Sequence, residues 1–324
     1  MTHKQHPLGT PFTPASTADE ILAGIDLTGR NAIVTGGHAG IGLEVTRALS
    51  RAGASVTVGA RNPDRAATAL AGITGIEVGK LDLIGPRSID AFAAGWLESG
   101  RPLHILINNA GASGGPERDA RGYETQFATN HLGHFQLTRA LLPALRAAQG
   151  ARVVNVSSGA QRFGGIRWDD PNFTSGYDSR AAYAQSKTAN VLFAVELDRR
   201  WAADGIRGYA VHPGVVVGTK LNSSAGGDAL RRMGLIDEAG QPIIDPATGK
   251  KTPSQGASTV VFAAASPMLA GIGGVYLKDN DISPLDDEPR QLTARCIPAE
   301  VVSHSIDPAS AERLWALSGR LLNA

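Results

Sequence analysis

The stretch Asn31–Ala48 reads NAIVTGGHAGIGLEVTRA. A short apolar run meets a glycine-rich turn, and apolar residues then recur at the spacing of a helix. This pattern predicts a strand, a tight turn and a helix that begins near Ile41. The glycines Gly36, Gly40 and Gly42 would let the backbone approach a phosphate group closely. The N-terminus of the helix would then direct its N–H groups and the positive end of its dipole at that phosphate.

The place of this turn in the chain strengthens the prediction, because it opens the first of several strand–helix alternations. Such alternation is typical of a doubly wound sheet that binds a dinucleotide. The spacing is Gly-x-x-x-Gly-x-Gly; the pattern Gly-x-Gly-x-x-Gly does not fit, because Val45 stands where its last glycine would be. Further strands are predicted at Ser55–Ala60, Ile76–Gly79, Leu103–Ile107, Arg152–Val156, Ile206–His212 and Gly274–Leu277.

Composition limits the classes of function that the chain can have. Its 324 residues include 31 Lys plus Arg against 30 Asp plus Glu, so no strong field would gather nucleic acid or an anionic membrane. The single cysteine, Cys296, excludes an internal disulfide and fits a reducing compartment. We find no signal peptide, and Ser266-Pro267 and several glycines interrupt the uncharged stretch Ala257–Leu277, so we expect no membrane span. The chain is therefore expected to be cytoplasmic, with residues 1–17 disordered or loosely draped.

Three more motifs follow predicted strands or open a predicted helix. Asn108-Asn109-Ala110-Gly111 ends the fourth strand, where small residues leave room for a ligand and an Asn side chain can tie strands together. Ser157-Ser158 follows the fifth strand, at the edge of the sheet where ligands bind. Tyr183 and Lys187 are four residues apart, which places a phenol and an ammonium on one face of a helix.

Taken in this order, the motifs resemble those of the short-chain dehydrogenase/reductase family, and the resemblance runs from about Leu27 to Leu277. It implies an N-terminal extension (residues 1–26) and one α/β domain (residues 27–324). That domain would be a Rossmann-type, doubly wound, seven-stranded parallel sheet. A long loop, Gly159–Ala182, and the sequence Asn-His-Leu-Gly-His-Phe at 130–135 resemble the retinol-dehydrogenase-like branch.

The resemblance also implies a reaction: hydride exchange between a nicotinamide and a carbonyl or alcohol of a small molecule. Tyr183 would be the general acid or base, Ser158 would donate a hydrogen bond to the substrate oxygen, and Asn130 would steady a proton relay through water. Lys187 would hold the nicotinamide ribose. A tyrosine ordinarily has a pKa of ~10, so positive charge from Lys187 and the oxidised nicotinamide is expected to favour the phenolate.

A set of residues is expected to bind the cofactor. Arg61 directly follows Ala60 at the end of the second strand, where an acid would select NAD(H); we therefore favour NADP(H). Thr219 stands one residue later than the family's usual threonine, since position 218 is glycine. The expected set is Gly36, His38, Gly40, Ile41, Gly42, Arg61, Asp82, Leu83, Asn109, Ala110, Gly111, Tyr183, Lys187, Pro213, Gly214, Val216 and Thr219.

Two segments outside the predicted sheet are expected to enclose the substrate. The loop Gly159–Ala182 carries four aromatic residues, which suggest an apolar substrate wall or, equally, a loop packed on itself. The segment Leu221–Gln255, with one short helix near Leu230–Leu235, is expected to be a lid-like insertion. The four aromatic residues are Phe163, Trp168, Phe173 and Tyr177.

Other predictions concern Tyr123–Ala148, which is predicted to be one long helical stretch. It places His131 and His134 at i and i+3, but no carboxylate or cysteine completes a metal site, so we predict none. A nucleotide-sensing protein without chemistry remains an alternative from another class. A sugar-nucleotide epimerase is a second alternative, disfavoured because Ala39 stands where that branch has glycine. The substrate, the direction of reaction and the oligomeric state, a homo-oligomer included, stay open.

Overall fold

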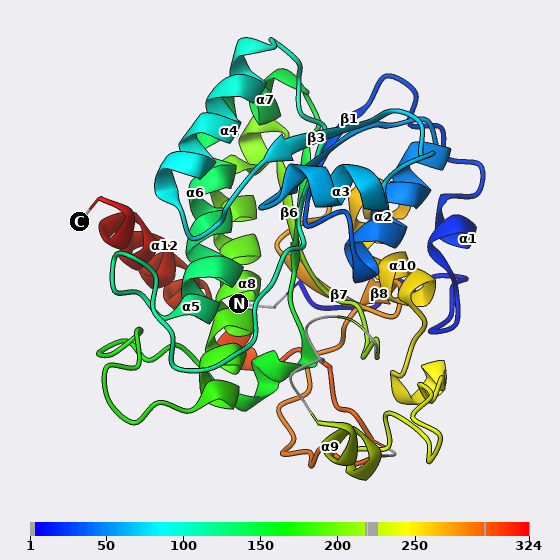
Figure 1. Ribbon diagram of the computed structural model, residues 1–324, viewed down its shortest axis with the longest axis vertical. Helices are drawn as coiled ribbons and strands as arrows, with labels where there is room; N and C mark the ends of the chain where they lie inside the picture. The colour runs from blue at the N-terminus through cyan, green and yellow to red at the C-terminus, as the bar shows by residue number, and fades with distance from the viewer. Residues whose placement is uncertain (1–3, 218, 220–225, 295, 324) are drawn as a thin grey trace.

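A single sheet of eight strands organises the chain in the computed structural model, which describes residues 4–217, 219, 226–294 and 296–323. The strand order is β3-β2-β1-β4-β5-β6-β7-β8, with helices on both faces (Figure 1). The first seven strands are parallel. The strands are β1 (Asn31–Thr35), β2 (Ser55–Ala60), β3 (Ile76–Lys80), β4 (Ile105–Asn108), β5 (Arg152–Val156), β6 (Arg207–His212), β7 (Val275–Lys278) and β8 (Asp281–Ile282).

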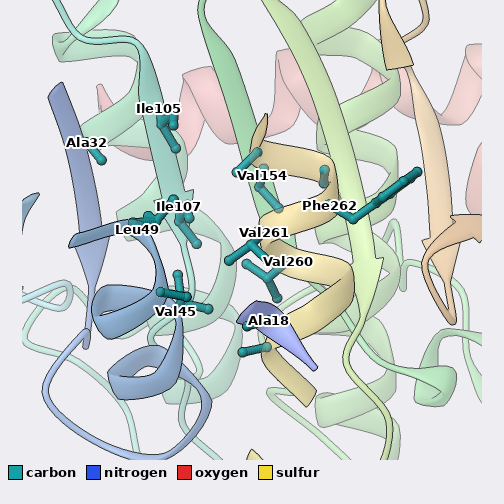
Figure 2. Close-up of a cluster of buried hydrophobic side chains, with 14 of the residues drawn as sticks. Ala18, Ala32, Val45, Leu49, Ile105, Ile107, Val154, Val260, Val261 and Phe262 are labelled. Carbon is teal, nitrogen blue, oxygen red and sulfur yellow. The ribbon is translucent and has the colours of Figure 1, made fainter. Parts of the chain in front are cut away.

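The strands are apolar on both faces because each face is covered by helices. Successive side chains of a strand point to opposite sides, so Val34 of β1 packs on the face covered by α2 and α10, and Ile33 packs on the opposite face with α4 and α6. Figure 2 shows the first face, where Val45 and Val261 approach the strands. The helices are α1 (Ala18–Leu22), α2 (Gly40–Arg51), α3 (Pro63–Ala69), α4 (Pro86–Glu98), α5 (Thr125–Phe127), α6 (Gly133–Ala140), α7 (Leu142–Ala147), α8 (Ser179–Trp201), α9 (Gly227–Arg232), α10 (Pro253–Ala265), α11 (Ser303–Ile306) and α12 (Pro308–Leu322).

The doubly wound α/β class is confirmed, but the prediction of seven strands, all parallel, is wrong by one strand. The eighth strand, β8, pairs antiparallel with β7. The two-residue turn between them consists of Asp279 (φ 52°) and Asn280 (φ 66°). Two successive residues with positive φ are what a tight hairpin turn requires, and Asp and Asn tolerate that conformation. The hairpin was missed because β8 is only two residues long.

The long helical stretch predicted over Tyr123–Ala148 is present from Thr125 to Ala147, but it is not one regular α-helix. The stretch divides into α5, a π-helical turn at Ala128–Leu132, α6 and α7. Pro143 stands in the first turn of α7, where its missing N–H is tolerated, and this separates α7 from α6. The π-helical turn includes Asn130, and such turns are frequently found at functional sites.

The prediction that residues 1–17 are disordered or loosely draped does not hold for the described part, residues 4–17. Gln5 is only 3% exposed, and its amide group pairs with both the N–H and the carbonyl of Tyr276 in β7, each at 2.9 Å. The Asp281 carboxylate accepts from the N–H groups of Leu8 (2.7 Å) and Gly9 (2.9 Å). The N-terminal segment therefore covers the end of the sheet at β7 and β8.

Other element bounds lie close to the predictions. The second and fifth strands have the predicted limits. The helix predicted at Leu230–Leu235 begins earlier, as α9, and α8 begins at Ser179, where Asp178 caps it by accepting from Ala181 N. The start of the predicted insertion, positions 221–225, lies outside the described residues. The division into an extension, one domain and a lid stays a prediction.

We predict that Gln5→Ala lowers the free energy of unfolding by about 1–3 kcal/mol, because it leaves the buried N–H of Tyr276 without its partner; the Tyr276 carbonyl loses one bond but still accepts from Ser283 N at 3.0 Å. Thermal unfolding monitored by circular dichroism would measure this. Gln241→Ala is the matched control, since Gln241 is exposed and its loss should change stability by less than about 0.5 kcal/mol. Equal effects of the two variants would contradict a structural role for the N-terminal segment.

Candidate active site

The glycine-rich turn after β1 leaves little room for a side chain at its glycine positions. Gly36 and Gly40 have φ values of +66° and +54°, a conformation that favours glycine. A Cβ atom at position 42 would lie 2.5 Å from Nδ2 of Asn109 and 2.6 Å from the Gly36 carbonyl oxygen. Helix α2 begins at Gly40, and the preceding residue, Ala39, has no side chain that could cap it. The backbone N–H groups at this end are therefore suited to an anion such as the pyrophosphate of a dinucleotide.

The Asn-Asn-Ala-Gly segment at the end of β4 is held against this turn by Thr35. The Thr35 hydroxyl accepts from the N–H groups of Asn109 and Ala110, both at 2.9 Å, and Asn109 Nδ2 donates to the Thr35 carbonyl at 2.9 Å. One strand further, Asn108 Nδ2 donates to Asn155 Oδ1 of β5 at 2.8 Å. The side chains of Asn108 and Asn109 thus link β4 to β5 and to β1, as the sequence led us to expect of an Asn side chain here.

The end of β2 and its neighbour β3 present cations. Ala60 is buried and Arg61, which follows it, is exposed. Lys80 is the last residue of β3, and its ammonium group donates a hydrogen bond to the Arg61 carbonyl at 2.5 Å. Lys80 therefore brings a second positive charge to this edge of the sheet. Asp82 is half-buried and its backbone N–H is bound by Ser88, while the adjoining Leu83 is buried against the start of α6. The sequence analysis missed Lys80, whose only signal was its position at the end of a strand.

Tyr183 and Lys187, from α8, meet Ser158 at the end of β5. The Lys187 ammonium lies 5.5 Å from the centre of the Tyr183 ring and donates to the Val156 carbonyl at 3.1 Å. Ser158 is close enough to Tyr183 for its hydroxyl to lower the pKa of the tyrosine. The neighbouring Ser157 binds the backbone of α8, since its hydroxyl donates to the Lys187 carbonyl at 2.7 Å. The structure therefore brings together the three groups that the sequence analysis singled out here.

Burial controls the pKa values of this pair. It raises the pKa of Tyr183 to about 12, with the hydrogen bond to Ser158 acting in the opposite direction. It lowers the pKa of Lys187 to about 8, so this ammonium is mostly protonated at pH 7. The expected lowering of the tyrosine pKa is therefore not produced by the protein's own groups. Desolvation of the phenolate outweighs the hydrogen bond from Ser158.

Asn130 lies in the π-helical turn, and its side chain is committed to protein groups. Its Oδ1 accepts from Ala112 N at 2.7 Å, and its Nδ2 donates to the Ala112 carbonyl and to Ser186 Oγ, both at 3.0 Å. The carboxamide thus fixes the segment after β4 to α8. The backbone carbonyl of Asn130 accepts instead from the ring of His134.

The turn after β6 closes the site from another side. Gly214 has φ +82°, and the side chain of Lys251 packs directly against it. Lys251 is buried and forms an ion pair with Asp279 at 2.6 Å. Sequence analysis missed this lysine, because nothing local to its sequence indicates burial. Pro213 precedes this glycine, and Val216, two residues after it, is 3% exposed.

Thr219 reaches the glycine-rich turn although it stands one residue later than expected. A Cβ atom added to Gly40 would lie 3.3 Å from the methyl group of Thr219. The Thr219 hydroxyl donates to the Val216 carbonyl at 3.2 Å. The displaced threonine is therefore a neighbour of the start of α2. His38, Ile41 and Gly111, the remaining residues of the expected cofactor set, lie in the two turns already described.

Most aromatic residues of the Gly159–Ala182 loop serve the packing of the loop itself. Phe173 is 2% exposed, Tyr177 donates to the Gly115 carbonyl at 2.7 Å, and Trp168 packs near α12 beneath Arg313. Only Phe163, which is 53% exposed, remains available as an apolar surface among the four. The alternative that the loop packs on itself therefore describes three of the four rings.

A further segment, of which residues 283–294 and 296–302 are described, borders the site and was not foreseen. Arg162, four residues after Ser158, donates to the carbonyls of Asp286 (2.8 Å) and Glu300 (3.0 Å). Lys250 donates to Ala294 O at 3.1 Å. The segment thus joins the turn after β5 to the end of the predicted lid. Its pairing depends on buried Arg and Lys side chains whose partners are backbone carbonyls, for which sequence offers no signal.

Two classes of feature do not occur among the described residues. The described helices include none long and apolar enough to cross a membrane. Within the same residues, no three His, Cys, Asp or Glu side chains gather as a metal site would require. His131 and His134 are directed to different partners: Ser318 Oγ at 2.7 Å and Thr35 Oγ1 at 2.8 Å.

We predict that the protein loses stability in mild acid, because burial lowers the pKa values of His131, His134 and His212 to about 3, 4 and 3. In the unfolded chain each has a pKa of ~6.5. The stabilisation that comes from keeping these three histidines neutral is complete above a pH of ~6.5, and it is lost as the pH falls towards 4. Uptake of one to three protons on unfolding corresponds to about 1.4–4 kcal/mol per pH unit. Urea unfolding between pH 7.5 and 5 measures this, and an unchanged midpoint would contradict it.

Comparison with known proteins identifies the family. The family model described as "short chain dehydrogenase" matches residues 30–229. A probable oxidoreductase of Streptomyces lividans is 43% identical, over 93% of this chain and all of the relative; human retinol dehydrogenase 12 is 36% identical, over 92% and 88%.

Solved structures agree with the family match. A protein of Mycobacterium paratuberculosis superimposes with a TM-score of 0.70 and 31% identity, covering 96% of this chain and 98% of that one. The Pseudomonas aeruginosa RhlG/NADP complex has the same fold, with a TM-score of 0.60 and 24% identity, over 78% and 95% of the two chains. The chain therefore belongs to the short-chain dehydrogenase/reductase family, is similar to its retinol-dehydrogenase-like members, and is an oxidoreductase of that family.

Proposed function

We propose that the protein is an NADP(H)-dependent oxidoreductase that exchanges hydride with a carbonyl or alcohol of an apolar small molecule, with Tyr183 as general acid and base. The observation that carries the proposal is the convergence of Tyr183, Lys187 and Ser158 at the edge of the sheet that also carries the glycine-rich turn, where a Cβ atom at Gly42 would have no room. When bound, the nicotinamide ring supplies or accepts the hydride, and the protein's residues orient the substrate and handle the proton.

The residues fit such a cofactor. The turn Gly36–Gly42 and the start of α2 would hold its pyrophosphate, and Asp82 and the segment after β4 would border its adenine side. Lys187 would hold the nicotinamide ribose, and the turn at Pro213-Gly214 would flank the nicotinamide amide. Arg61 and Lys80 provide positive charge where the 2′-phosphate of NADP(H) would lie. The residue before Arg61 is Ala60, so no carboxylate would repel that phosphate.

The proton chemistry follows from the pKa values. With a pKa of about 12, Tyr183 carries its proton at neutral pH, which suits donation to the alkoxide that forms when a carbonyl is reduced. Lys187 is held close to the ring, and its charge stabilises the phenolate once the proton has left. Ser158 would donate to the substrate oxygen. Asn130 would steady the relay that returns a proton to Tyr183 by fixing α8, since its carboxamide is bound to Ser186.

An apolar substrate is supported by Phe163, whose exposed ring lies on the turn that starts at Ser158. The described part of the insertion, residues 226–255, is anchored at its end, since Lys251 N donates to Val215 O at 3.0 Å. We propose that it acts as a lid over the substrate, inside the single domain 27–324. With one exposed cysteine, Cys296, the chain suits the cytoplasm.

The alternative of a nucleotide sensor without chemistry is disfavoured, because burying two ionisable side chains in the site is energetically unfavourable. Burying Lys187 and Tyr183 raises the free energy of both ionised forms, as their shifted pKa values indicate. Perturbed groups of this kind cluster where chemistry occurs. A nucleotide sensor would need the turn after β1 and a ribose contact such as that of Lys187, but it would not need the buried hydroxyl of Tyr183 beside them.

We predict that kcat/KM with NADPH exceeds that with NADH, because Arg61 can form charge-assisted hydrogen bonds to a 2′-phosphate. Ala60→Asp should lower the NADPH value by about 10–100-fold, through repulsion and loss of those bonds. Steady-state kinetics with both cofactors measures this. Lys80→Ala should also lower kcat/KM with NADPH, but by a smaller factor than Ala60→Asp. A wild-type preference for NADH would overturn the cofactor assignment.

We predict that Tyr183→Phe lowers kcat by about 10²–10⁴-fold and leaves NADP⁺ affinity nearly unchanged, because only the proton-donating hydroxyl is removed. Screening apolar ketones, aldehydes and alcohols would first supply a substrate. Tyr123→Phe is the matched control: its hydroxyl donates to Leu321 O on α12, so its loss should affect stability alone. Retention of more than about a tenth of the activity by Tyr183→Phe would place the general acid elsewhere.

A further inference from the structure

His134 of α6 lies buried between two parts of the site that belong to different elements. Its ring is 1% exposed. Nδ1 is 3.0 Å from the backbone carbonyl oxygen of Asn130, in the π-helical turn, and Nε2 is 2.8 Å from the Thr35 hydroxyl, at the end of β1. The imidazole therefore bridges the turn that carries Asn130 and the strand that leads into the glycine-rich turn.

The directions of these hydrogen bonds are determined by chemistry. A carbonyl oxygen can only accept, so Nδ1 of His134 must carry the ring proton. Burial and the nearby charge of Lys187 lower the pKa of His134 to about 4, so Nε2 is unprotonated at neutral pH. Nε2 then accepts from the Thr35 hydroxyl; the other acceptor within reach, the Ile107 carbonyl, is farther away at 3.4 Å.

This orientation of the Thr35 hydroxyl has a consequence for the segment after β4. With its proton directed at His134, the hydroxyl oxygen offers its lone pairs to the N–H groups of Asn109 and Ala110, both at 2.9 Å. These two residues pack against the glycine-rich turn, where Ala110 Cβ would lie 3.2 Å from a Cβ atom at Gly36. The imidazole thus determines how this part of the cofactor site is held.

We propose that His134 is a positioning residue for the cofactor: through Thr35 it fixes the Asn109–Ala110 segment, and through the Asn130 carbonyl it fixes the π-helical turn. The inference rests on the proposed function only in that the cofactor occupies the glycine-rich turn. It assigns to His134 no contact with the substrate.

The chain provides a matched control in His131, which lies three residues earlier. It is equally buried, at 1% exposure, and burial likewise lowers its pKa, to about 3. Its Nε2 pairs with Ser318 Oγ of α12 at 2.7 Å, and its ring packs against Phe127 and Phe193 at 5.2 and 5.8 Å. Its contacts therefore lead away from the cofactor site, so its loss should affect stability alone.

The test compares His134→Leu with His131→Leu. Affinity for NADP⁺ and NAD⁺ is measured by calorimetry, so that neither turnover nor the cofactor preference enters the result, and thermal unfolding is followed in parallel. Both variants should lower the melting temperature. His134→Leu should also raise the cofactor Kd by about tenfold, the equivalent of one hydrogen bond, whereas His131→Leu should leave it unchanged. Equal changes in Kd for the two variants would overturn the proposal.

A double-mutant cycle isolates the bridge. Thr35→Val should weaken cofactor binding, and its effect should add little to that of His134→Leu, because both break the same link. His134→Gln, whose Oε1 can still accept from Thr35, should recover part of the affinity; His134→Asn, which is too short to reach Thr35, should not. Additive single effects would overturn the proposal.

A spectroscopic measurement keeps the proposal testable where a variant does not fold. Ring ¹⁵N spectra of the wild-type protein should show His134 as the Nδ1–H tautomer throughout pH 6–8. The Nε2–H tautomer would overturn the assignment. If the cofactor Kd responds as described but no carbonyl or alcohol is turned over, the proposed reaction fails and the positioning role stands.

Discussion

The carboxyl ends of β1, β4 and β5 meet at one edge of the sheet, and hydrogen bonds between side chains and backbone hold them there. Thr35 joins β1 to the segment after β4, and Asn108 joins β4 to Asn155 of β5. Parallel strands place all their carboxyl ends on the same side, so residues that are far apart in the sequence become neighbours. The glycine-rich turn, Ser158 and the segment after β4 therefore border one site.

The electrostatics of that site result from burial more than from pairing. Lys187 is 3% exposed, and its ammonium is bound by a backbone carbonyl; among the residues that the structure describes, no carboxylate forms an ion pair with it. Desolvation therefore lowers the pKa of Lys187 and raises that of Tyr183. Both shifts favour the neutral forms: the pKa of Lys187 moves towards neutral pH, whereas that of Tyr183 moves further from it. A site of this kind responds strongly to any charge that a ligand brings.

The end of the sheet at β7 and β8 depends on segments from both ends of the chain. Gln5 pairs with the backbone of β7 and Asp281 with the N-terminal segment. Residues 283–302 then return to the turn after Ser158, where Arg162 binds their carbonyls (the orange segment near α9 in Figure 1). The region that borders the proposed substrate site is thus assembled from long-range contacts, whereas the cofactor side uses local turns.

The sequence by itself determined the class of fold and the family. Strand–turn–helix alternation has a local signature, and glycine is required where a backbone must adopt positive φ or approach a ligand, so Gly36 and Gly42 were identifiable from sequence. The spacing of Tyr183 and Lys187 on one helix was equally local. Their roles, like the cofactor preference and the lid, remain proposals.

Only the tertiary structure decided how these parts are held. The two-residue strand β8, the docking of Gln5, the burial of Lys251 against Gly214 and the bridge made by His134 all depend on partners distant in sequence. Periodicity and turn chemistry describe interactions between near neighbours, so they carry no information about such pairs. Packing determines whether a histidine at a given helical position meets a phenylalanine cluster, as His131 does, or a threonine at the cofactor turn.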